Sequence, residues 1–309
     1  MASPQRRLPI VWHEGYEADI GLHVFPTRKY RAAHDRLIGE GTIAETDIRR
    51  PEPVSDEHVA LVHTPQYLEK IKYSEFSWQD VMLLEVPYTP ELREAMWLCA
   101  GGSILTGRLA LEHGLAVHLG GGFHHGFPDH GEGFCLINDV AIALRVLQRE
   151  GLIERAVVLD CDLHHGNGTA AIFTGEPEVF TFSIHQQHNY PMWKPPSDFD
   201  LGLQDGTGDE EYLGLLQAHV PQILEDQRPD LAFYLAGADP YREDQLGGLS
   251  LSREGLRRRD ELIFRLTGTA GVPVAVTLAG GYARRFEDTV EIHCETVRAA
   301  QRQMQGTRS

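Results

Sequence analysis

The sequence has 309 residues, of which 42% are hydrophobic and 24% are charged, a composition typical of a globular protein. Its formal net charge of −17 argues against direct nucleic-acid binding, which needs a basic surface, and is compatible with cationic substrates. No apolar run approaches the ~20 residues of a membrane helix, and Met1–Arg7 lacks the apolar core of a signal peptide. The four cysteines form no C-x-x-C pair, which predicts reduced core residues of a cytoplasmic protein.

Short apolar runs alternate with segments of helical spacing along most of the chain. The predicted strands are Leu8–Trp12, Leu115–Leu119, Ala156–Leu159, Val179–Ile184, Leu231–Leu235 and Val274–Leu278. The predicted helices are Phe25–Ile38, Gln66–Lys72, Thr89–Gly114, Asn138–Arg149, Asn167–Phe173, Glu210–Glu225, Ser252–Thr269 and Phe286–Gln303. This alternation indicates βαβ units, so we predict an α/β protein of three layers with a mainly parallel central sheet.

The sequence shows no sign of a division into domains. It contains no internal repeat, no low-complexity segment and no linker. The charged stretch Asp47–Ser55, which contains two prolines, is a predicted surface loop. We therefore expect a single domain over residues 1–309, with an ordered core at about 8–303.

The longest predicted helix carries clear signals at both ends. Thr89 can cap its start, Pro90 suits the first helical position, and Gly114 can close its end. The pair Gly101-Gly102 interrupts the helix interior. Because glycine lacks a side chain, this pair predicts close packing of the helix against another backbone.

An alternating pattern of polar residues follows the strand Ala156–Leu159. Asp160, Asp162 and His164 occupy every second position, and alternate residues of an extended chain point to the same side. Burying two carboxylates and an imidazole is costly unless they are paired or hold a metal ion. The pattern indicates a metal site, with a capped strand end as the alternative.

Polar residues also follow four other predicted strands. They are Gly120–Gly126 (Gly-Gly-Gly-Phe-His-His-Gly), Ser183 with His185, Gly237–Asp239 and Gly280–Tyr282. In open α/β sheets, ligands bind outside the carboxyl ends of the strands. Five strand ends that deliver Gly with His, Asp or Tyr to one rim predict an active site. Taken singly, a histidine here would more often be a core residue, and the Gly-Gly-Tyr turn could be only a tight turn with a packing aromatic residue.

Several of these segments match a known family in their order along the chain. They are Gly121–His125, Gly133–Cys135, Asp160–Gly168, Ala238-Asp239 and Gly280–Tyr282, and together they resemble the zinc-dependent histone deacetylases. That superfamily includes acetylpolyamine amidohydrolases and shares its fold with arginases. Asp244–Ser252 and Arg259–Arg265 look most like the class IV branch, here in a bacterial-type homologue. The resemblance covers about residues 10–289 and implies the arginase/deacetylase fold.

The resemblance implies a catalytic metal centre. Asp162, His164 and Asp239 would be its three protein ligands, with a fourth position open for water or substrate. Zinc is the expected metal, and iron(II) is possible because nitrogen and oxygen ligands accept several first-row metals.

The resemblance also implies the residues that move protons. His124 and His125 would face the scissile amide, one as general base and one as donor to the leaving amine. Asp160 would be the partner of His124, and Asn167 the partner of His125. Some family members have Asp where this chain has Asn167, so we expect less stabilisation of a charged His125. Tyr282 would donate its hydroxyl to the developing oxyanion.

Substrate and cation sites follow from the same resemblance. Gly133 and Phe134 resemble the wall that grips an acyl-lysine stem, with core packing as the alternative for Phe134. Leu246 falls on the opposite wall, and Gly281 with Gly280 would leave room for the acyl group. The residues that match the inner potassium site of the family are Asp160, Asp162, His164 and Ser183. The loop from His185 to Trp193 lies at the rim, and we assign no catalytic role to it.

The expected function is a metal-dependent amidohydrolase that removes acetyl or longer acyl groups from the ε-amino group of lysine in proteins or peptides. One alternative is a deacetylase of acylated polyamines or other small molecules. Another is a non-catalytic acyl-lysine-binding protein, which the complete set of ligands, histidines and tyrosine disfavours. Arginase-like chemistry is disfavoured because two histidines stand where a second metal site would have carboxylates. We expect neither nucleic acid nor a membrane as a partner, and the oligomeric state cannot be predicted.

Overall fold

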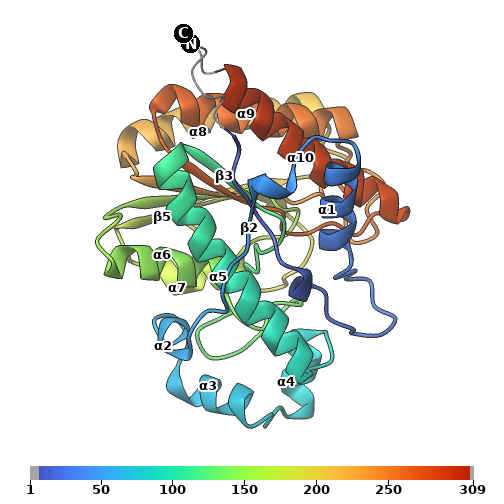
Figure 1. Ribbon diagram of the computed structural model, residues 1–309, viewed down its shortest axis with the longest axis vertical. Coiled ribbons are helices and arrows are strands. Elements are labelled where there is room, and N and C mark those ends of the chain that lie inside the picture. The colour runs from blue at the N-terminus through green and yellow to red at the C-terminus, as the bar shows by residue number, and fades with distance from the viewer. Residues whose placement is uncertain (1–6, 307–309) are drawn as a thin grey trace.

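The computed structural model describes residues 7–306, and all strands found in this range belong to one parallel sheet (Figure 1). The strands are β1 (Ile10–Val11), β2 (Ile48–Arg49), β3 (Leu115–His118), β4 (Ala156–Asp160), β5 (Val179–Gln186), β6 (Phe199–Leu203), β7 (Leu231–Leu235) and β8 (Val274–Thr277). Their order is β2-β1-β3-β8-β7-β4-β5-β6, and every pairing is parallel. The predicted α/β class with a mainly parallel sheet is confirmed.

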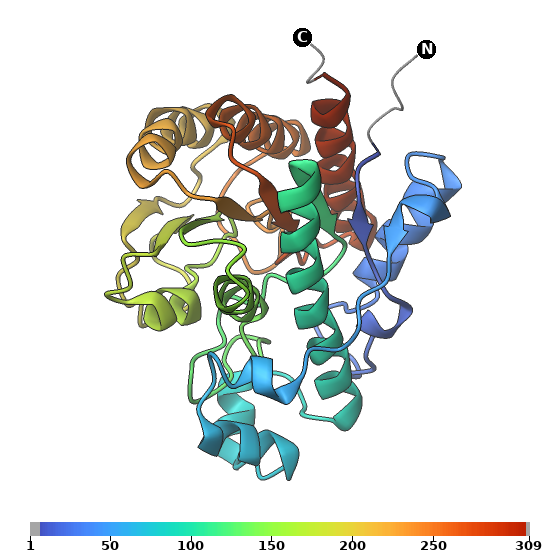
Figure 2. The same cartoon turned by 60° about the vertical axis from the view of Figure 1, so that its left-hand side comes forward.

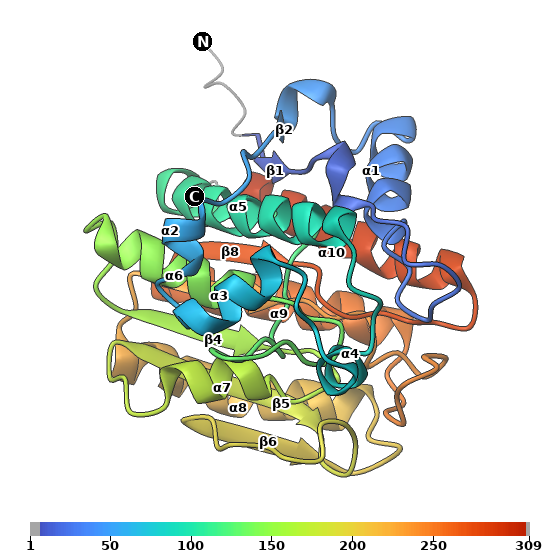
Figure 3. The same ribbon diagram turned by 90° about the horizontal axis from the view of Figure 1, so that it is seen from below.

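Helices cover both faces of the sheet. They are α1 (Lys29–Gly39), α2 (Asp56–Val59), α3 (Pro65–Lys72), α4 (Trp78–Leu84), α5 (Pro90–His113), α6 (Asp139–Arg149), α7 (Asn167–Phe173), α8 (Asp209–Gln227), α9 (Arg253–Ala270) and α10 (Phe286–Gly306). The helices α5, α6 and α7 lie in front of the sheet in Figure 3, and α8, α9 and α10 lie behind it. In Figure 2, α8 and α9 run side by side. The molecule thus has the three predicted layers.

Helix α5 begins and ends where its sequence signals predict. The Thr89 hydroxyl accepts the backbone N–H of Leu92 at 3.1 Å, and Gly114 ends the helix with a φ of 89°. A Cβ added at Gly101 would overlap the backbone oxygen of Glu52. Gly101 therefore allows α5 to approach the backbone that follows β2, as predicted, whereas Gly102 faces the side chains of Tyr16 and His118.

Two strands and two short helices were not predicted. The strands β2 and β6 form the two edges of the sheet, and β6 alternates half-buried and exposed residues. An edge strand is paired along one side only, and its residues need not form the continuous apolar run of a buried central strand. The short strand β2 therefore gave no strand signal within the predicted loop Asp47–Ser55. The helices α2 and α4 have only four and seven residues.

The central strands bring their carboxyl ends to one level. Register pairs Asp160 of β4 with Ser183 of β5 and with Leu235 of β7, and Leu235 with Thr277 of β8. The polar segments that follow these strands therefore begin side by side at one edge of the sheet. The described cysteines are all buried and free, and no helix among residues 7–306 is long and apolar enough to span a membrane.

Acid should destabilise the fold through His63, which ties α3 to the loop before α6. The buried His63 ring donates from Nδ1 to the Phe127 carbonyl and accepts the Asn138 N–H at Nε2, so it must be neutral. Burial lowers the pKa of His63 from 6.5 to about 4. Between these values the unfolded chain binds a proton that the folded chain does not, so the folded state loses stability as pH falls. We expect His63 to account for about 2 kcal/mol of the loss between pH 7 and pH 5.

Urea unfolding at both pH values measures this loss. His63→Gln keeps a donor and an acceptor but cannot titrate, so the stability of this variant should fall less steeply with acid. His188→Gln, at an exposed position, serves as the control. Equal slopes for the wild type and His63→Gln would contradict the assignment.

Candidate active site

Three potential metal ligands meet where β4 and β7 end. His164 Nδ1 lies 3.2 Å from Asp162 Oδ1 and 3.4 Å from Asp239 Oδ2. Ligands bound to one tetrahedral zinc ion at ~2.1 Å would be about 3.4 Å apart. Asp239 Oδ1 accepts the Leu163 N–H, whereas Asp239 Oδ2 is buried without a hydrogen-bond partner. A buried carboxylate oxygen left unpaired and aimed at two other ligand atoms fits a bound cation.

The charges around these atoms also call for a cation. Burial lowers the pKa of His164, but the hydrogen bond to Asp162 and the nearby Asp239 carboxylate outweigh it and raise the pKa to about 10. Burial and the nearby Asp162 carboxylate raise the pKa of Asp239. The two carboxylates therefore favour the protonated form of the His164 imidazole, and a bound divalent metal ion would displace the added proton. The residues fit a metal centre.

The two adjacent histidines differ in charge because their partners differ. His124 Nδ1 donates to Asp160 Oδ2 at 2.7 Å, and His125 Nδ1 donates to Asn167 Oδ1 at 2.6 Å. Burial lowers the pKa of His124, but Asp160 and Asp162 overcome it and raise the pKa to about 9. Burial and the charge of His124 lower the pKa of His125 well below its usual value. The surroundings thus shift the pKa values of the two rings in opposite directions, which is how neighbouring groups are given separate acid and base roles.

The loop that carries both histidines is anchored by Asp139, the first residue of α6. Its carboxylate accepts the N–H groups of Gly122 at 3.0 Å and of Phe123 at 2.6 Å. A Cβ at Gly121, where φ is 68°, would lie 2.5 Å from Asp139 Oδ2. The glycines that precede His124 are therefore needed for this close approach of the backbone to a buried carboxylate.

Tyr282 enters the site from the turn after β8. Its backbone N–H donates to Asp244 Oδ2 at 2.7 Å, and the Gly280 N–H donates to Asp162 Oδ2 at 2.8 Å. The buried Lys29 donates to the Ala279 carbonyl at 2.7 Å and lies 5.4 Å from the centre of the Tyr282 ring. Burial lowers the pKa of Lys29 to about 8, against the attraction of the nearby carboxylates. These contacts tie the turn both to a metal ligand and to α1.

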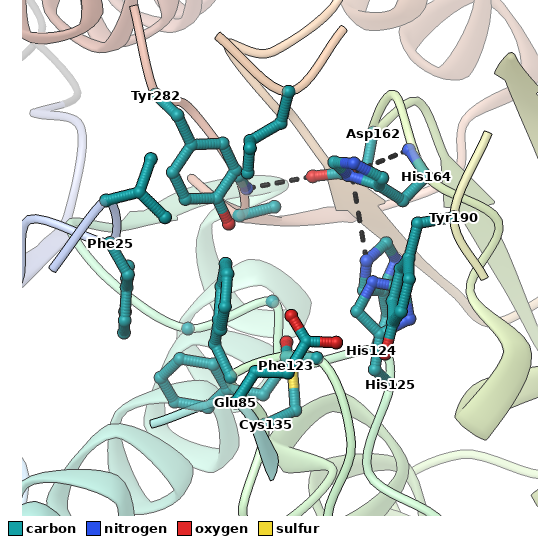
Figure 4. A pocket seen from close by; sticks show the side chains of 18 of the residues that line it. Phe25, Glu85, Phe123, His124, His125, Cys135, Asp162, His164, Tyr190 and Tyr282 are labelled. Carbon is teal, nitrogen blue, oxygen red and sulfur yellow. Dashed lines mark hydrogen bonds and ion pairs between the residues drawn. The ribbon is translucent and has the colours of Figure 1, made fainter. Parts of the chain in front are cut away.

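One pocket of about 270 Å³ collects most of the predicted residues (Figure 4). Its lining includes His124, His125, Asp162, His164, Tyr282, Gly133, Phe134 and Leu246. The lining includes Gly280 and not Gly281, which the sequence analysis placed beside the acyl group. A Cβ at Gly281 would lie 2.9 Å from Ala238 Cβ and from Thr289 Cγ2, so Gly281 packs against the interior behind the pocket.

Phe134 points into the pocket because its backbone is left-handed, with a φ of 70°. Its ring stacks on Phe25 at a centroid distance of 5.8 Å and meets Tyr282 edge-on, also at 5.8 Å. A non-glycine residue in this conformation costs free energy that the surrounding structure must offset. The aromatic walls thus come from three distant parts of the chain, at Phe25, Phe134 and Tyr282.

Several lining residues carried no sequence prediction. Figure 4 shows Tyr190 beside His125 on one side of the pocket, with Phe25 and Tyr282 opposite and Glu85 in the foreground. Tyr190 belongs to the rim loop, for which no catalytic role was predicted. The only sequence signal for Tyr190 was an aromatic residue directly before Pro191. Glu85 follows α4 in a left-handed conformation, with a φ of 60°. Burial raises the pKa of Glu85, and so does the nearby Glu132 carboxylate.

The residues predicted to bind potassium lie together near the carboxyl end of β4, beside β5. Ser183 is paired in register with Asp160, and its hydroxyl is 3.0 Å from His185 Nδ1. Asp162 and His164 follow Asp160 directly. Potassium binding there stays a prediction, because backbone carbonyls would supply several of its ligands.

A second cluster with metal-ligand spacing includes the residue that follows His164 in the chain. It consists of His165, His185 and Asp200. His165 Nε2 is 3.2 Å from both Asp200 Oδ1 and Ser197 Oγ, and His185 Nδ1 is bonded to the Ser183 hydroxyl. A buried atom without a hydrogen-bond partner occurs in both clusters, at His165 Nδ1 and at Asp239 Oδ2. We assign the metal to the first cluster because Asp162 and His164 line the pocket, whereas no residue of the second cluster does.

A parallel α/β sheet with a group of residues at its carboxyl ends that could hold a metal ion is the arrangement expected of a metal-dependent α/β enzyme. The family model of the histone deacetylase domain matches residues 23–297. The chain therefore belongs to the histone deacetylase family.

The chain is also similar to individual proteins. An uncharacterized protein of Picosynechococcus sp. is 40% identical over 293 residues, which cover 94% of this chain and 98% of that protein. Histone deacetylase 2 of Arabidopsis thaliana is 28% identical over 305 residues, which cover 93% and 79% of the two chains. The crystal structure of the HDA15 HD domain has the same fold, with a TM-score of 0.77 at 23% identity over 96% of this chain and 91% of that one.

Proposed function

We propose that this protein is a metal-dependent deacylase that releases acetyl or longer acyl groups from the ε-amino group of lysine in proteins or peptides. The observation that carries this proposal is a pocket lined by two of the proposed metal ligands, both histidines and the tyrosine. The family membership supports an acylated amide as the substrate. At about 270 Å³ the pocket lies just below the ~300–1,000 Å³ of typical ligand sites, so it suits one slender chain.

A divalent ion held by Asp162, His164 and Asp239 would polarise the amide carbonyl and lower the pKa of a water molecule. The remaining chemistry belongs to side chains of this protein. The neutral His125 is the general base, since its Nδ1 proton is engaged by Asn167 and its other nitrogen is free to accept a proton. The same ring then returns the proton to the leaving amine.

Two other groups would stabilise the charge that develops. His124, held protonated by Asp160, supplies a fixed positive charge beside the reacting atoms. The Tyr282 hydroxyl donates to the carbonyl oxygen as it becomes an oxyanion. Phe134 and Leu246 would grip the aliphatic stem between them, which orients the amide toward these groups.

We further propose zinc as the metal, with iron(II) as the competing occupant, and potassium at the inner site. The class IV assignment rests on the segments Asp244–Ser252 and Arg259–Arg265, and a cytoplasmic location rests on the reduced cysteines. We also propose that the whole of residues 1–309 acts as one domain, because the described strands share one sheet.

A substrate panel tests the proposed function. Purified enzyme would be assayed on acetyl-, butyryl- and myristoyl-lysine peptides beside acetylated polyamines, with release of the free amine as the readout. We expect hydrolysis of at least one acyl-lysine peptide, and its abolition by a chelator. Turnover unaffected by chelation would contradict the metal-dependent mechanism, and no turnover of any substrate would contradict the function.

Glu85 favours a second candidate, a deacetylase of acylated polyamines. Its side chain borders the pocket and is close enough to Glu132 for the two carboxylates to affect each other. A second cationic group on the substrate would be attracted to this pair. In the same panel, Glu85→Gln should raise KM for acetylated polyamines several-fold more than for an uncharged acyl-lysine amide. An equal effect on both substrates would remove the reason for this candidate.

A further inference from the structure

A carboxylate stands behind the amide that holds His125. Asn167 Oδ1 accepts His125 Nδ1–H at 2.6 Å, and Asn167 Nδ2 donates to Glu132 Oε1 at 2.7 Å. The same Asn167 oxygen also accepts the backbone N–H of Gly168 at 3.1 Å. His125, Asn167 and Glu132 therefore form one continuous chain of hydrogen bonds that starts at the proposed base.

This chain can be assembled in only one way. The Gly168 N–H can only donate, so an oxygen of Asn167 must face it, and the Glu132 carboxylate can only accept, so the Asn167 NH₂ group must face Glu132. The amide orientation is thus decided from both ends, whereas an isolated asparagine can be turned over. Since the amide oxygen faces His125, the ring must carry a proton on Nδ1, and in the neutral ring this leaves Nε2 unprotonated.

Glu132 is itself held in place. Its backbone exchanges hydrogen bonds with Cys135, since the Glu132 N–H donates to the Cys135 carbonyl and the Cys135 N–H donates to the Glu132 carbonyl. Its side chain is 14% exposed, and Oε1 also accepts the Tyr190 hydroxyl at 3.2 Å. Oε2 lies 3.6 Å from His130 Nε2. The carboxylate is therefore directed at Asn167 by groups on both flanks.

We propose that Glu132 is a positioning residue for the general base: it fixes the Asn167 amide, and through it the tautomer and orientation of His125. The Gly168 N–H holds the oxygen end of this amide, and Glu132 supplies the acceptor for its NH₂ end, so the two together secure the orientation. The carboxylate that an aspartate would place next to His125 is here set one amide further away. This inference rests on the proposed function of His125 and extends it to a residue outside the pocket lining.

Exchanging the carboxylate and the amide between positions 132 and 167 tests the proposal. Glu132→Gln should lower kcat about 10-fold with little change in KM, because the new amide no longer dictates which end of Asn167 turns toward it. Asn167→Asp should lower kcat by about 10- to 100-fold, because two carboxylates would then face each other at hydrogen-bond distance. The double variant should recover most of the wild-type kcat, since a glutamine N–H would donate to the new aspartate. A merely structural role for Glu132 would not produce this mutual rescue.

Two controls complete the design. Glu225→Gln, on an exposed position of α8, should leave kcat and KM unchanged, and Tyr190→Phe should show how much of the effect comes from the tyrosine that shares Glu132. Thermal unfolding of each variant confirms that it is folded. Wild-type kcat in Glu132→Gln, or losses that simply multiply in the double variant, would overturn the inference.

A second readout separates this inference from the proposed function. In metal-free protein labelled with ¹⁵N-histidine, the His125 ring should show the Nδ1–H tautomer in the wild type and a mixture of tautomers in Glu132→Gln. An unchanged spectrum overturns the inference even where activity falls. If the wild type hydrolyses no acyl amide, the proposed function fails, and the spectrum alone decides the role of Glu132.

Discussion

Tyr282→Phe should lower kcat by about 100- to 1000-fold, the usual consequence of removing one donor to a developing oxyanion. KM should change little, because the hydroxyl interacts with the oxygen more strongly in the transition state than in the bound substrate. The aromatic ring is retained, so its contacts with Phe25 and Phe134 survive and the pocket keeps its shape. Steady-state kinetics on the best peptide of the substrate panel measures the effect.

A second variant separates this loss from a general effect of removing a phenol hydroxyl. Tyr88→Phe deletes the hydroxyl of a half-buried tyrosine, which donates to the Ile71 carbonyl and lies outside the pocket lining. Its kinetics should equal those of the wild type. If both Tyr282→Phe and Tyr88→Phe retained full activity, Tyr282 would be a packing residue and the oxyanion would need another donor.

Asp239→Asn should abolish metal binding and, with it, activity. The substitution preserves the oxygen that accepts the Leu163 N–H, but it replaces the unpaired Oδ2 by an amide nitrogen that cannot bind a cation. We expect a loss of more than about 100-fold in kcat/KM, beyond the 10- to 100-fold typical of a lost supporting hydrogen bond. Elemental analysis should show about one zinc or iron ion per wild-type chain and a strongly reduced content in the variant.

The second histidine cluster provides the control for this experiment. Asp200→Asn alters the group formed by His165, His185 and Asp200 and leaves the first cluster intact. Its metal content should equal that of the wild type. Metal loss in Asp200→Asn together with retention in Asp239→Asn would reverse the assignment of the two clusters.

Asn167 stands where some family members have Asp, and the structure gives it a partner that the sequence does not indicate. The sequence leads to the expectation that a charged His125 is less stabilised. Burial and the charges of His124 and His164 lower the pKa of His125, whereas its bond to Asn167 raises it. The structure adds that the amide is bonded to the Glu132 carboxylate. The negative charge is therefore still connected to His125, at the distance of one amide group.

The sequence by itself determined those features that depend on neighbouring residues. The caps of α5 at Thr89 and Gly114 are local signals, because a helix end is satisfied by residues within one turn. The spacing of Asp162 and His164 after a buried strand is equally local, since it follows from the alternation of side chains in an extended chain. The order of strands and helices was sufficient to predict the parallel α/β class.

Only the tertiary structure decided which distant residues complete the site. Glu132 reaches Asn167, Tyr190 reaches Glu132, and Phe25 stacks on Phe134, although no local pattern marks any of these pairs. The edge strand β6 and the placement of Gly281 behind the pocket were likewise hidden in the sequence. The physical reason is that a hydrogen bond or a ring contact between distant segments depends on where the whole sheet places their loops, whereas caps and strand alternation are satisfied within a few residues.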